Sequence, residues 1–367
     1  MRRVVQFSTG NVGRHSLRAI IGRSDLELVG VHASGPSKIG RDASELCDWS
    51  EPTGVIATDD VDALIALRPD CVVYTALAET RPMEAIEELS KILAAGIDVV
   101  GTSFVWMAAP RYAGDWVREP LEKACAAGGS SLYINGIDPG YSGDTLVHTA
   151  LSLATRVATI TVQEIFDYAN YDDAEYTGAA MGFGVSEDDE LPPLYLPGVV
   201  ESMWGGQVRS LADGLGITLD EVRQRTERWF TPERIDCTMM TVHPGQMAAV
   251  RFATEGVIDG RVVITLEHVN RLTSAAAPDW DFPPDGHVGV HRVVIDGDPR
   301  VEVNTHVSHP VLDPTDAGCI STAARAVNAI DWVCNAPVGL VAVEDIPQAA
   351  IIKGLMWAPD REPRLPA

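Results

Sequence analysis

The sequence lacks the motifs that mark several common classes of enzyme. None of its six cysteines belongs to a C-x-x-C pair, and its nine histidines show no H-E-x-x-H or other zinc-ligand spacing. We therefore expect reduced thiols and no metal site. The sequence also has no G-x-x-x-x-G-K-[ST] loop and no G-x-S-x-G turn, which argues against an ATPase, a kinase or a serine hydrolase.

Basic residues and long apolar runs are also scarce. The chain has 28 Lys and Arg against 52 Asp and Glu, a formal net charge of -24, which disfavours binding to nucleic acid or to anionic membranes. No segment approaches the ~20 apolar residues of a membrane span, and none resembles a secretion signal, so we expect a cytoplasmic protein. A length of 367 residues with 46% hydrophobic content suffices for two domains.

The most informative segment lies near the N-terminus. The apolar run Arg3–Phe7 leads into a glycine-containing turn, after which residues 16–21 have helical spacing. Gly10 and Gly13 occupy the second and third glycine places of G-x-G-x-x-G, while Ser8 stands at the first. A strand, a turn and a helix start in this order predict a site for a dinucleotide pyrophosphate. An ordinary turn between a strand and a helix is the alternative.

Strands and helices alternate over residues 1–139, which predicts an α/β dinucleotide-binding Rossmann domain with a doubly wound parallel sheet. The apolar spacing of Met83–Ala95 predicts one of its helices. The expected strands are Arg3–Phe7, Leu26–Ala33, Gly54–Ala57, Asp70–Leu77, Asp98–Gly101 and Ser131–Asn135.

Residues 140–312 show longer alternating strands, which predict an α+β domain with a mostly antiparallel sheet for substrate binding and oligomerisation. Helices are expected at Val199–Leu215 and Leu219–Phe230. C-terminal helices within residues 313–357 are expected to return and complete the first domain. The expected strands are Ala158–Ile165, Gln246–Gly256, Arg261–Asn270, Gly289–Asp296 and Arg300–Val307.

The end of the second expected strand bears on the choice of cofactor. NAD sites usually carry an acidic residue there for the ribose 2′-hydroxyl, but this chain has His32 and no acid until Asp42. The hydroxyls and cations that follow suit a 2′-phosphate, so we expect NADP(H), with NAD(H) as the alternative. These groups are Ser34, Ser37, Lys38 and Arg41, with Arg14 across the first turn. The other explanation is that Lys38 and Arg41 are ordinary solvated charges of the loop.

Several segments together resemble the dihydrodipicolinate reductase-like proteins, and within them the 2,4-diaminopentanoate dehydrogenase and amine dehydrogenase branch. These segments are Ser8–Gly13, Pro36–Asp42, Asn135–Gly140, Ala326–Ile330, Ala336–Leu340 and Asp345–Pro347. The resemblance covers both ends of the chain and the domain junction, and is less specific over residues 170–290. It implies a Rossmann domain, a second domain with the substrate pocket and the subunit contact, and a homodimer or larger oligomer. It also implies hydride transfer between a nicotinamide and a carbon doubly bonded to oxygen or nitrogen.

The loop after the fifth strand departs from that family pattern. The amine-forming members carry an acidic residue there that helps to handle ammonia and the imine, whereas Val99–Pro110 contains no carboxylate and the neighbouring sequence offers no replacement. The lysine-rich catalytic segment of true dihydrodipicolinate reductases is also missing. These departures favour an NAD(P)H-dependent reductase of a small, fairly apolar ketone, aldehyde or imine. An amine dehydrogenase and a cofactor-binding sensor without turnover are the alternatives.

Ligands of such sheets bind at the carboxyl ends of the strands, which selects the candidate site residues. The candidates for cofactor binding are Ser8, Thr9, Gly10, Asn11, Val12, Gly13, Arg14, Ser34, Ser37, Lys38, Arg41, Ala76, Leu77, Ala78, Thr102, Ser103 and Asn135. The candidates for substrate binding are Phe104, Trp106, Asp138 and Asp144. The candidate proton donors are Tyr141, Tyr168 and Tyr171.

Each of these candidates has a structural alternative. Asp138 could be the N-cap of the next helix, and the tyrosines could pack on the surface. Trp204 and Trp280 could line a substrate pocket, although core packing is commoner for tryptophan.

Overall fold

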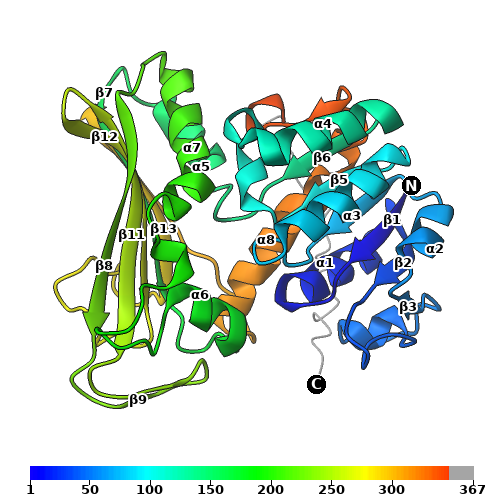
Figure 1. The fold of residues 1–367 in the computed structure, drawn as a ribbon, viewed down its shortest axis with the longest axis horizontal. Coiled ribbons are helices and arrows are strands. Elements are labelled where there is room, and N and C mark those ends of the chain that lie inside the picture. Colours follow the sequence, from blue (N-terminus) through cyan, green and yellow to red (C-terminus); the bar gives the residue numbers. More distant parts are fainter. Residues whose placement is uncertain (347–367) are drawn as a thin grey trace. The chain divides into compact units, whose positions relative to one another are not determined.

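The computed structural model describes residues 1–346 and divides the chain into two compact units (Figure 1). The first unit contains Met1–Ile137 and the chain from Cys319 onward, and the second contains Asp138–Gly318. Residues 347–357, part of the C-terminal segment expected to complete the first domain, lie outside the described residues. Within residues 1–346, no helix combines the length and the apolar character that crossing a membrane would need.

The first unit is built on a seven-stranded parallel sheet of order β15-β6-β5-β4-β1-β2-β3, which confirms the predicted doubly wound arrangement. Its strands are β1 (Arg2–Phe7), β2 (Leu26–His32), β3 (Ala57–Thr58), β4 (Cys71–Tyr74), β5 (Asp98–Gly101), β6 (Ser131–Ile134) and β15 (Gly339–Leu340). The helices are α1 (Asn11–Ile21), α2 (Val61–Ala66), α3 (Pro82–Ala94), α4 (Asp115–Gly128) and α8 (Pro314–Val333). Short 3-10 turns are η1 (Ala43–Leu46), η2 (Val105–Ala108), η3 (Pro110–Tyr112) and η6 (Val343–Asp345).

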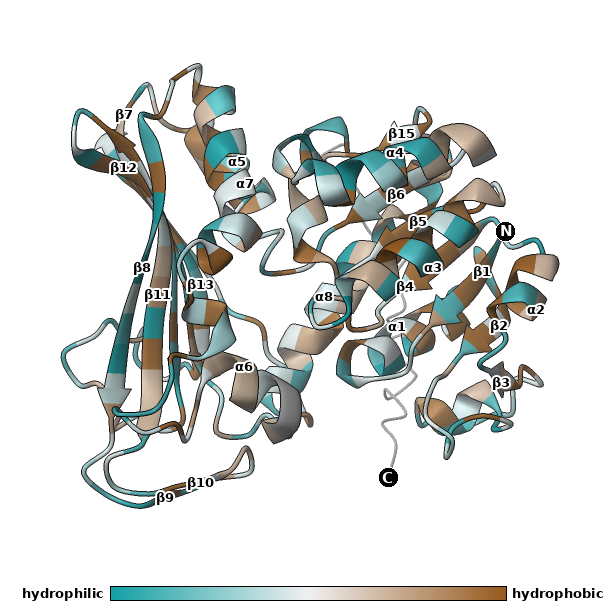
Figure 2. Cartoon of the chain, in the orientation of Figure 1, coloured by the Kyte–Doolittle hydropathy of each residue, from teal (hydrophilic) through white to brown (hydrophobic). Residues whose placement is uncertain are grey.

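Both faces of this sheet are buried, because helices cover each of them. On one face, β-strand side chains such as Val5 and Val72 pack with α3 and α4. On the other face, Val4 and Val73 pack against Ile330 of α8, so this helix from the C-terminal part of the chain packs on the first unit. Figure 2 shows the resulting concentration of hydrophobic residues on β1 and β2. Strands buried on both faces explain the continuous apolar runs of the sequence.

The second unit is a six-stranded mixed sheet of order β14-β13-β7-β12-β11-β8, in which only β7 and β12 run parallel. Its strands are β7 (Arg156–Asp167), β8 (Glu221–Phe230), β11 (Met247–Ile258), β12 (Arg261–Arg271), β13 (Gly289–Asp298) and β14 (Val301–Thr305). A small hairpin pairs β9 (Ile235–Asp236) with β10 (Thr241–Val242). The helices are α5 (Thr145–Leu151), α6 (Ala179–Met181) and α7 (Val199–Leu215), with η4 (Ala174–Gly178) and η5 (Pro193–Tyr195).

Helices α5 and α7 lie on one face of this sheet, which we call the inner face (Figure 1). Alternate residues of the strands point to this face, and at one end of the sheet they are apolar. Ile160, Val162 and Leu266 there pack against Val208 and Leu211 of α7. The opposite, outer face carries no helix in Figure 1.

The prediction of a helix at Leu219–Phe230 is wrong, because residues 221–230 form the edge strand β8, antiparallel to β11. Its residues alternate with a period of two: Val222 packs into the inner core, while Arg223 and Arg225 form ion pairs with Glu255 of β11. The many hydrophilic residues of β8, visible in Figure 2, resemble a solvated helix face. The alternation is the signal that distinguishes a half-buried strand.

Candidate functional site

The turn between β1 and α1 has the geometry that the dinucleotide fingerprint requires. Ser8, at the first glycine place, has a φ of 78°, a left-handed conformation that normally favours glycine. Gly13 allows α1 to approach the strand closely, since a Cβ there would overlap the carbonyl oxygen of Ser8. The buried Gln6 fixes the turn by donating to the Ser8 carbonyl at 2.8 Å and accepting from the Ser16 hydroxyl at 2.7 Å.

The start of α1 is suited to a phosphate. Gly10 is its N-cap and provides no side-chain cap, and the first turn of the helix carries no acidic residue. The backbone N–H groups of this turn and the positive end of the helix dipole therefore favour an anion. The buried hydroxyl of Thr9 has no hydrogen-bond partner among the described residues. These features fit a dinucleotide pyrophosphate.

A cluster of cations lies beside this turn. The ammonium of Lys38 donates to the Thr9 carbonyl at 2.8 Å, and its pKa is lowered by burial and by the nearby charges of Arg41 and Arg14. Arg41 also pairs with Glu45 at 2.9 Å. Ser34 and Ser37 are exposed in the same loop.

His32 occupies the place where many NAD sites have an acidic residue. It ends β2, and its ring stacks on that of Phe7 with the centroids 3.8 Å apart. Burial lowers the pKa of His32, so the neutral imidazole is favoured. No carboxylate therefore takes the position that would repel a 2′-phosphate.

A row of four side chains crosses the inner face of the second unit, beyond its apolar end. Phe252, His268, Glu164 and His291 come from β11, β12, β7 and β13, and each is in register with the next. The His268 ring stacks on Phe252 with the centroids 4.5 Å apart, and its Nδ1 lies 3.7 Å from a carboxylate oxygen of Glu164. Glu164, His268 and His291 are all buried.

Asp138, which follows β6 at the start of the second unit, completes the cluster. One of its oxygens lies 3.4 Å from Nε2 of His268 and accepts from the indole N–H of Trp204 at 3.1 Å. The other oxygen accepts from the Ser142 hydroxyl at 2.8 Å. Tyr168 extends the network by donating to Glu164 at 3.1 Å.

These contacts fix the charges of the cluster. Burial disfavours a charged His268, but the carboxylates of Asp138 and Glu164 outweigh burial and raise its pKa. Burial acts against a charged Asp138 as well, yet the charge and hydrogen bond of His268 lower the pKa of Asp138. Burial and the Glu164 carboxylate raise the pKa of Tyr168 well above its usual value. The cluster thus holds an imidazolium between two carboxylates, with a neutral tyrosine hydroxyl beside them.

Comparison with known proteins identifies the family of the chain. The family model described as the 2,4-diaminopentanoate dehydrogenase C-terminal domain matches residues 141–359. An amine dehydrogenase from Streptomyces virginiae is 38% identical over 344 residues, covering 94% of this chain and 95% of the relative. The chain belongs to the 2,4-diaminopentanoate dehydrogenase family. It is an NAD(P)H-dependent oxidoreductase.

Solved structures confirm the fold of this dehydrogenase. The amine dehydrogenase from Mycobacterium smegmatis matches with a TM-score of 0.75 and 19% identity, covering 94% of this chain and 96% of that chain. A putative myo-inositol dehydrogenase from Sinorhizobium meliloti matches with a TM-score of 0.56 and 14% identity, covering 94% and 93%.

The structure brings two of the candidate residues of this dehydrogenase, Asp138 and Tyr168, into the acidic cluster. Sequence reasoning missed His268, Glu164 and His291 as site residues. Each is a polar residue at an inward position of an otherwise apolar strand, and this break in the alternation is the signal that could have identified them. Because they come from three different strands, no spacing of histidines and acids along the sequence indicates them.

The remaining candidates of the second unit lie in different surroundings. The suggestion that Asp138 caps a helix is wrong, because α5 begins at Thr145 and its cap is Asp144. Tyr141 packs against the apolar core between α5 and the sheet. Tyr171 contacts the edge of the Tyr168 ring at 5.9 Å. Trp280 packs with Ile165 away from the cluster.

The loop after β5 does receive a carboxylate, contrary to the expectation that nothing nearby supplies one. Glu79, which follows β4, accepts hydrogen bonds from the N–H groups of Phe104 at 2.6 Å and Val105 at 3.1 Å. Sequence reasoning missed it because the acid belongs to the preceding loop. Phe104 itself is fully buried and contacts Trp106 edge to face, so its ring belongs to the core of the first unit.

The other candidates for cofactor binding lie at the carboxyl ends of the central strands. Ala76 and Ala78 are buried while Leu77 is exposed, in the loop after β4. Thr102 and Ser103 directly follow β5 and are partly exposed. Asn135 follows β6, is buried and accepts from the guanidinium of Arg325 at 3.0 Å.

The two glycines of the turn provide a matched test of this geometry. We expect Gly13→Ala to destabilise the protein by about 2 kcal/mol, because the added methyl group would overlap the Ser8 carbonyl and lie 2.8 Å from the Thr75 hydroxyl. Gly10→Ala should change stability by less than about 0.5 kcal/mol, since nothing lies within 4 Å of a Cβ there and the backbone φ is -77°. Chemical denaturation measures both variants, and equal losses would contradict the close approach at Gly13.

Proposed function

We propose that this chain is an amine dehydrogenase that uses NADPH to convert a small, fairly apolar ketone or aldehyde into an amine. The observation that carries the proposal is the buried cluster of Asp138, Glu164 and His268, in which two carboxylates face a single imidazolium. The excess negative charge suits a cationic nitrogen, such as an iminium or an ammonium product, better than a neutral carbonyl. The likeness to the Streptomyces virginiae amine dehydrogenase supports the same conclusion.

The overall reaction converts one ketone, one ammonium ion, NADPH and a proton into one alkylammonium ion, NADP+ and water. The nicotinamide of a cofactor whose pyrophosphate binds at the glycine turn would supply the hydride. The task of the protein is to hold the nitrogen and to move protons. Tyr168 supports this task as a positioning residue, because its hydroxyl stays protonated and donates a hydrogen bond to the Glu164 carboxylate.

Preference for NADP(H) over NAD(H) is the second part of the proposal. The cations of Lys38 and Arg41 follow a second strand that ends in His32 in place of an acid. A 2′-phosphate would gain charge-assisted hydrogen bonds from these groups and meet no carboxylate at the strand end.

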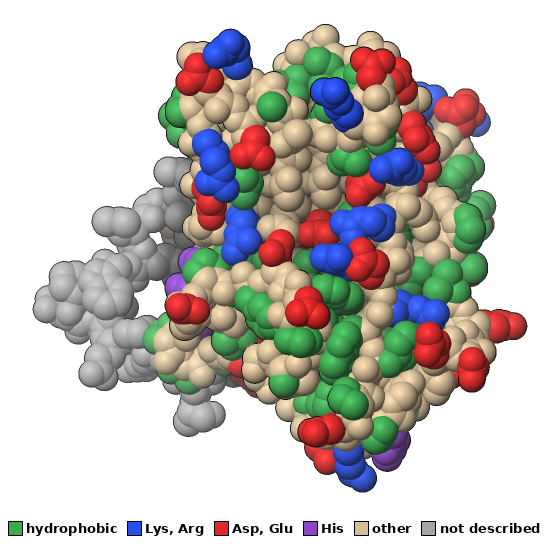
Figure 3. Space-filling model, turned by 90° about the vertical axis from the view of Figure 1, so that its left-hand side faces the viewer, with side chains coloured by type: hydrophobic (Ala, Val, Ile, Leu, Met, Phe, Trp, Pro, Cys, Tyr) green, Lys and Arg blue, Asp and Glu red, His purple; other side chains and the backbone are tan. Residues whose placement is uncertain are grey.

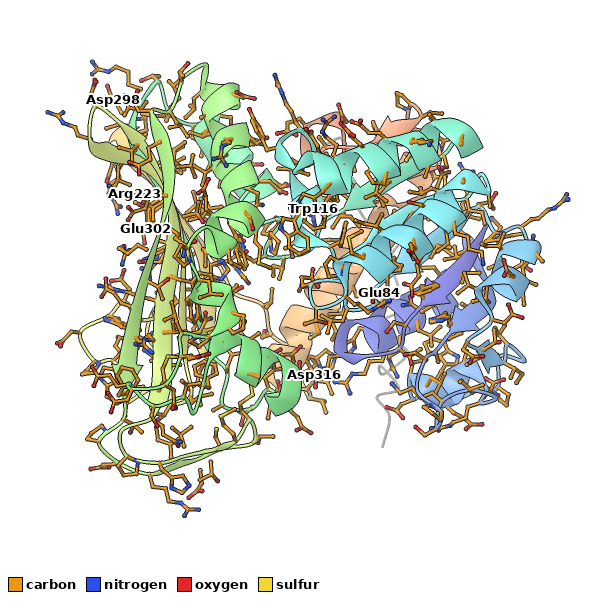
Figure 4. All side chains as sticks on the ribbon, viewed as in Figure 1. Glu84, Trp116, Arg223, Asp298, Glu302 and Asp316 are labelled. Carbon is orange, nitrogen blue, oxygen red and sulfur yellow. The ribbon has the colours of Figure 1, made fainter. Side chains whose placement is uncertain are left out.

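A second copy of this chain is the partner that we propose for the outer face of the six-stranded sheet. Ion pairs link its strands: Arg223, which is labelled in Figure 4, pairs with Glu255 at 3.0 Å, and Arg225 pairs with Glu267 at 2.7 Å. Figure 3 shows Lys and Arg side chains beside Asp and Glu over this side. Positive and negative side chains alternate over this face. A second copy related by a two-fold axis would therefore not be repelled by an excess of charge of one sign.

Dependence on ammonium tests the proposed activity. With a panel of short ketones and aldehydes, NADPH oxidation in ammonium chloride should exceed that in potassium chloride of equal ionic strength by about ten-fold or more. With 15N-labelled ammonium, mass spectrometry should find the label in the amine product. Formation of an alcohol at the same rate in both salts would identify a carbonyl reductase, and no turnover with tight NADPH binding would identify a sensor.

The cofactor preference is tested at Lys38. We expect Lys38→Met to lower the affinity for NADPH about ten-fold relative to that for NADH, because a charge-assisted hydrogen bond to the 2′-phosphate is lost. Lys91→Met is the control, since Lys91 is exposed and pairs with Asp62 of α2 at 2.7 Å. Nucleotide fluorescence titration measures both dissociation constants. An unchanged preference would contradict the role of Lys38.

The oligomeric state is tested by light scattering. We expect twice the mass of 39.4 kDa of one chain. Arg225→Glu should weaken the association, because it places a fourth carboxylate beside those of Glu227, Glu255 and Glu267. The mass of a single chain at micromolar concentration would contradict the dimer.

A further inference from the structure

The acidic cluster of the second unit contains buried polar atoms that no group in the described part of the chain satisfies. Nδ1 of His291 and Oδ1 of Asn270 have no partner there, although His291 is only 2% exposed and Asn270 is fully buried. Leaving such atoms without a partner costs about 1–3 kcal/mol each. Oδ1 of Asn270 can only accept, so it indicates a ligand that donates hydrogen bonds, whereas Nδ1 of His291 can accept from such a ligand when it carries no proton.

The side chains that carry these unpartnered atoms lie next to the carboxyl groups of the cluster. Asp138, Glu164 and His291 each offer one potential ligand atom, and these three atoms all lie within 4.8 Å of one another. The amide N–H of Asn270 donates at 3.4 Å to the Glu164 oxygen that also accepts from the Tyr168 hydroxyl. Asp138, Glu164 and His291 therefore come close enough together to contact one small ion.

The charge of the cluster favours a single positive charge among these side chains. Two acidic side chains, Asp138 and Glu164, face the single imidazolium of His268, so the acidic groups outnumber the histidine whose pKa they raise. Arg271, on β12, points to the opposite side of the sheet, where it donates to the Ala276 carbonyl. No Lys or Arg of the described residues forms an ion pair with Asp138 or Glu164.

A monovalent cation with N–H donors fits this cluster better than a divalent metal. The His268 imidazolium lies 3.4 Å from the Asp138 oxygen, so a cation bound to the same carboxylate would be close to a positive charge. In a buried site this repulsion is twice as large for a doubly charged ion as for a singly charged one. Trp204 and Ser142 already donate to Asp138, which orients the carboxylate without filling all its lone pairs. An ammonium ion offers four N–H donors to the acceptors that remain.

We propose that Asp138, Glu164, His291 and Asn270 form a binding site for ammonium or for the ammonium group of an amine. The proposal rests on the proposed amine dehydrogenase activity and assigns the nitrogen of that reaction to these residues. The site holds the ion through its N–H donors and through the two acidic side chains. Tyr168 and His268 act as positioning residues, because each contacts the Glu164 carboxylate and neither supplies the excess negative charge.

Binding of ammonium without turnover is the first measurement. The probe is ammonium chloride alone, compared with tetramethylammonium chloride at equal ionic strength, and the readout is the melting temperature. An ion at ten times its Kd should raise the melting temperature of the unmodified protein by about 3 °C, and the tetramethyl ion, which has no N–H donor, should not.

The variants are Glu164→Gln and Asp138→Asn, each of which removes one negative charge and keeps the shape of the side chain. The amide introduced by Asp138→Asn keeps a carbonyl oxygen that can accept from Trp204 or Ser142, so this variant should fold even if the first one does not. Asp296→Asn is the matched control, because Asp296 is an exposed carboxylate on the same strand as His291. We expect either cluster variant to lose the ammonium stabilisation and to raise the KM for ammonium about ten-fold, with the Kd for NADPH unchanged.

The outcomes separate the site from the proposed function. If the protein aminates ketones but both cluster variants keep their KM for ammonium and their stabilisation, the site is refuted and the function stands. If no ketone is aminated but ammonium stabilises the protein and the cluster variants lose this effect, the site stands and the function fails. Loss of the ammonium effect on treatment with a chelator, and its return with Zn2+ or Mn2+, would identify a metal site and overturn the proposal.

Discussion

The pairing of the buried His268 imidazolium with two carboxylates is the constraint on which the second unit depends. A buried charge without a partner costs several kcal/mol, so His268 requires Asp138 on one side and Glu164 on the other. Glu164 meets this requirement only in the observed register of β7 with β12. A shift of one residue would turn Glu164 to the outer face and bring a neighbour such as Gln163 to the inner one.

The inner face of this one sheet thus has two parts with different roles. Towards one end, Ile160 and Leu266 pack with α5 and α7 and provide the stability of the unit. Two or more residues further along the same strands, Glu164 and His268 carry charge. Because both parts share rigid, paired strands, the positions of the charged groups are fixed by the hydrogen bonds of the sheet, which is a more precise support than a loop.

The architecture could be predicted from the sequence where local patterns determine it. The parallel sheet follows from alternating apolar strands and helices, and the glycine turn from the spacing of Gly10 and Gly13. The strand β8 was not recognised, because its charged residues face solvent and pair with β11, a partner that the local sequence does not reveal.

The candidate site was harder to predict than the fold. His268, Glu164 and His291 are distant in sequence and are neighbours only through strand pairing. Their chemistry depends on this pairing, since the pKa of His268 is raised by carboxylates from two other segments. A sequence pattern indicates which residues are inward-facing, whereas the register determines which of them meet.

The hydrogen bonds of Glu79 have a consequence for how the first unit can vary. One carboxylate, carried by the loop after β4, holds the backbone of the loop after β5 through Phe104 and Val105. The two loops therefore share a single anchor, and neither can change length without moving the other. Insertions that most surface loops tolerate would be restricted here, and variation should concentrate in loops that lack such a shared support.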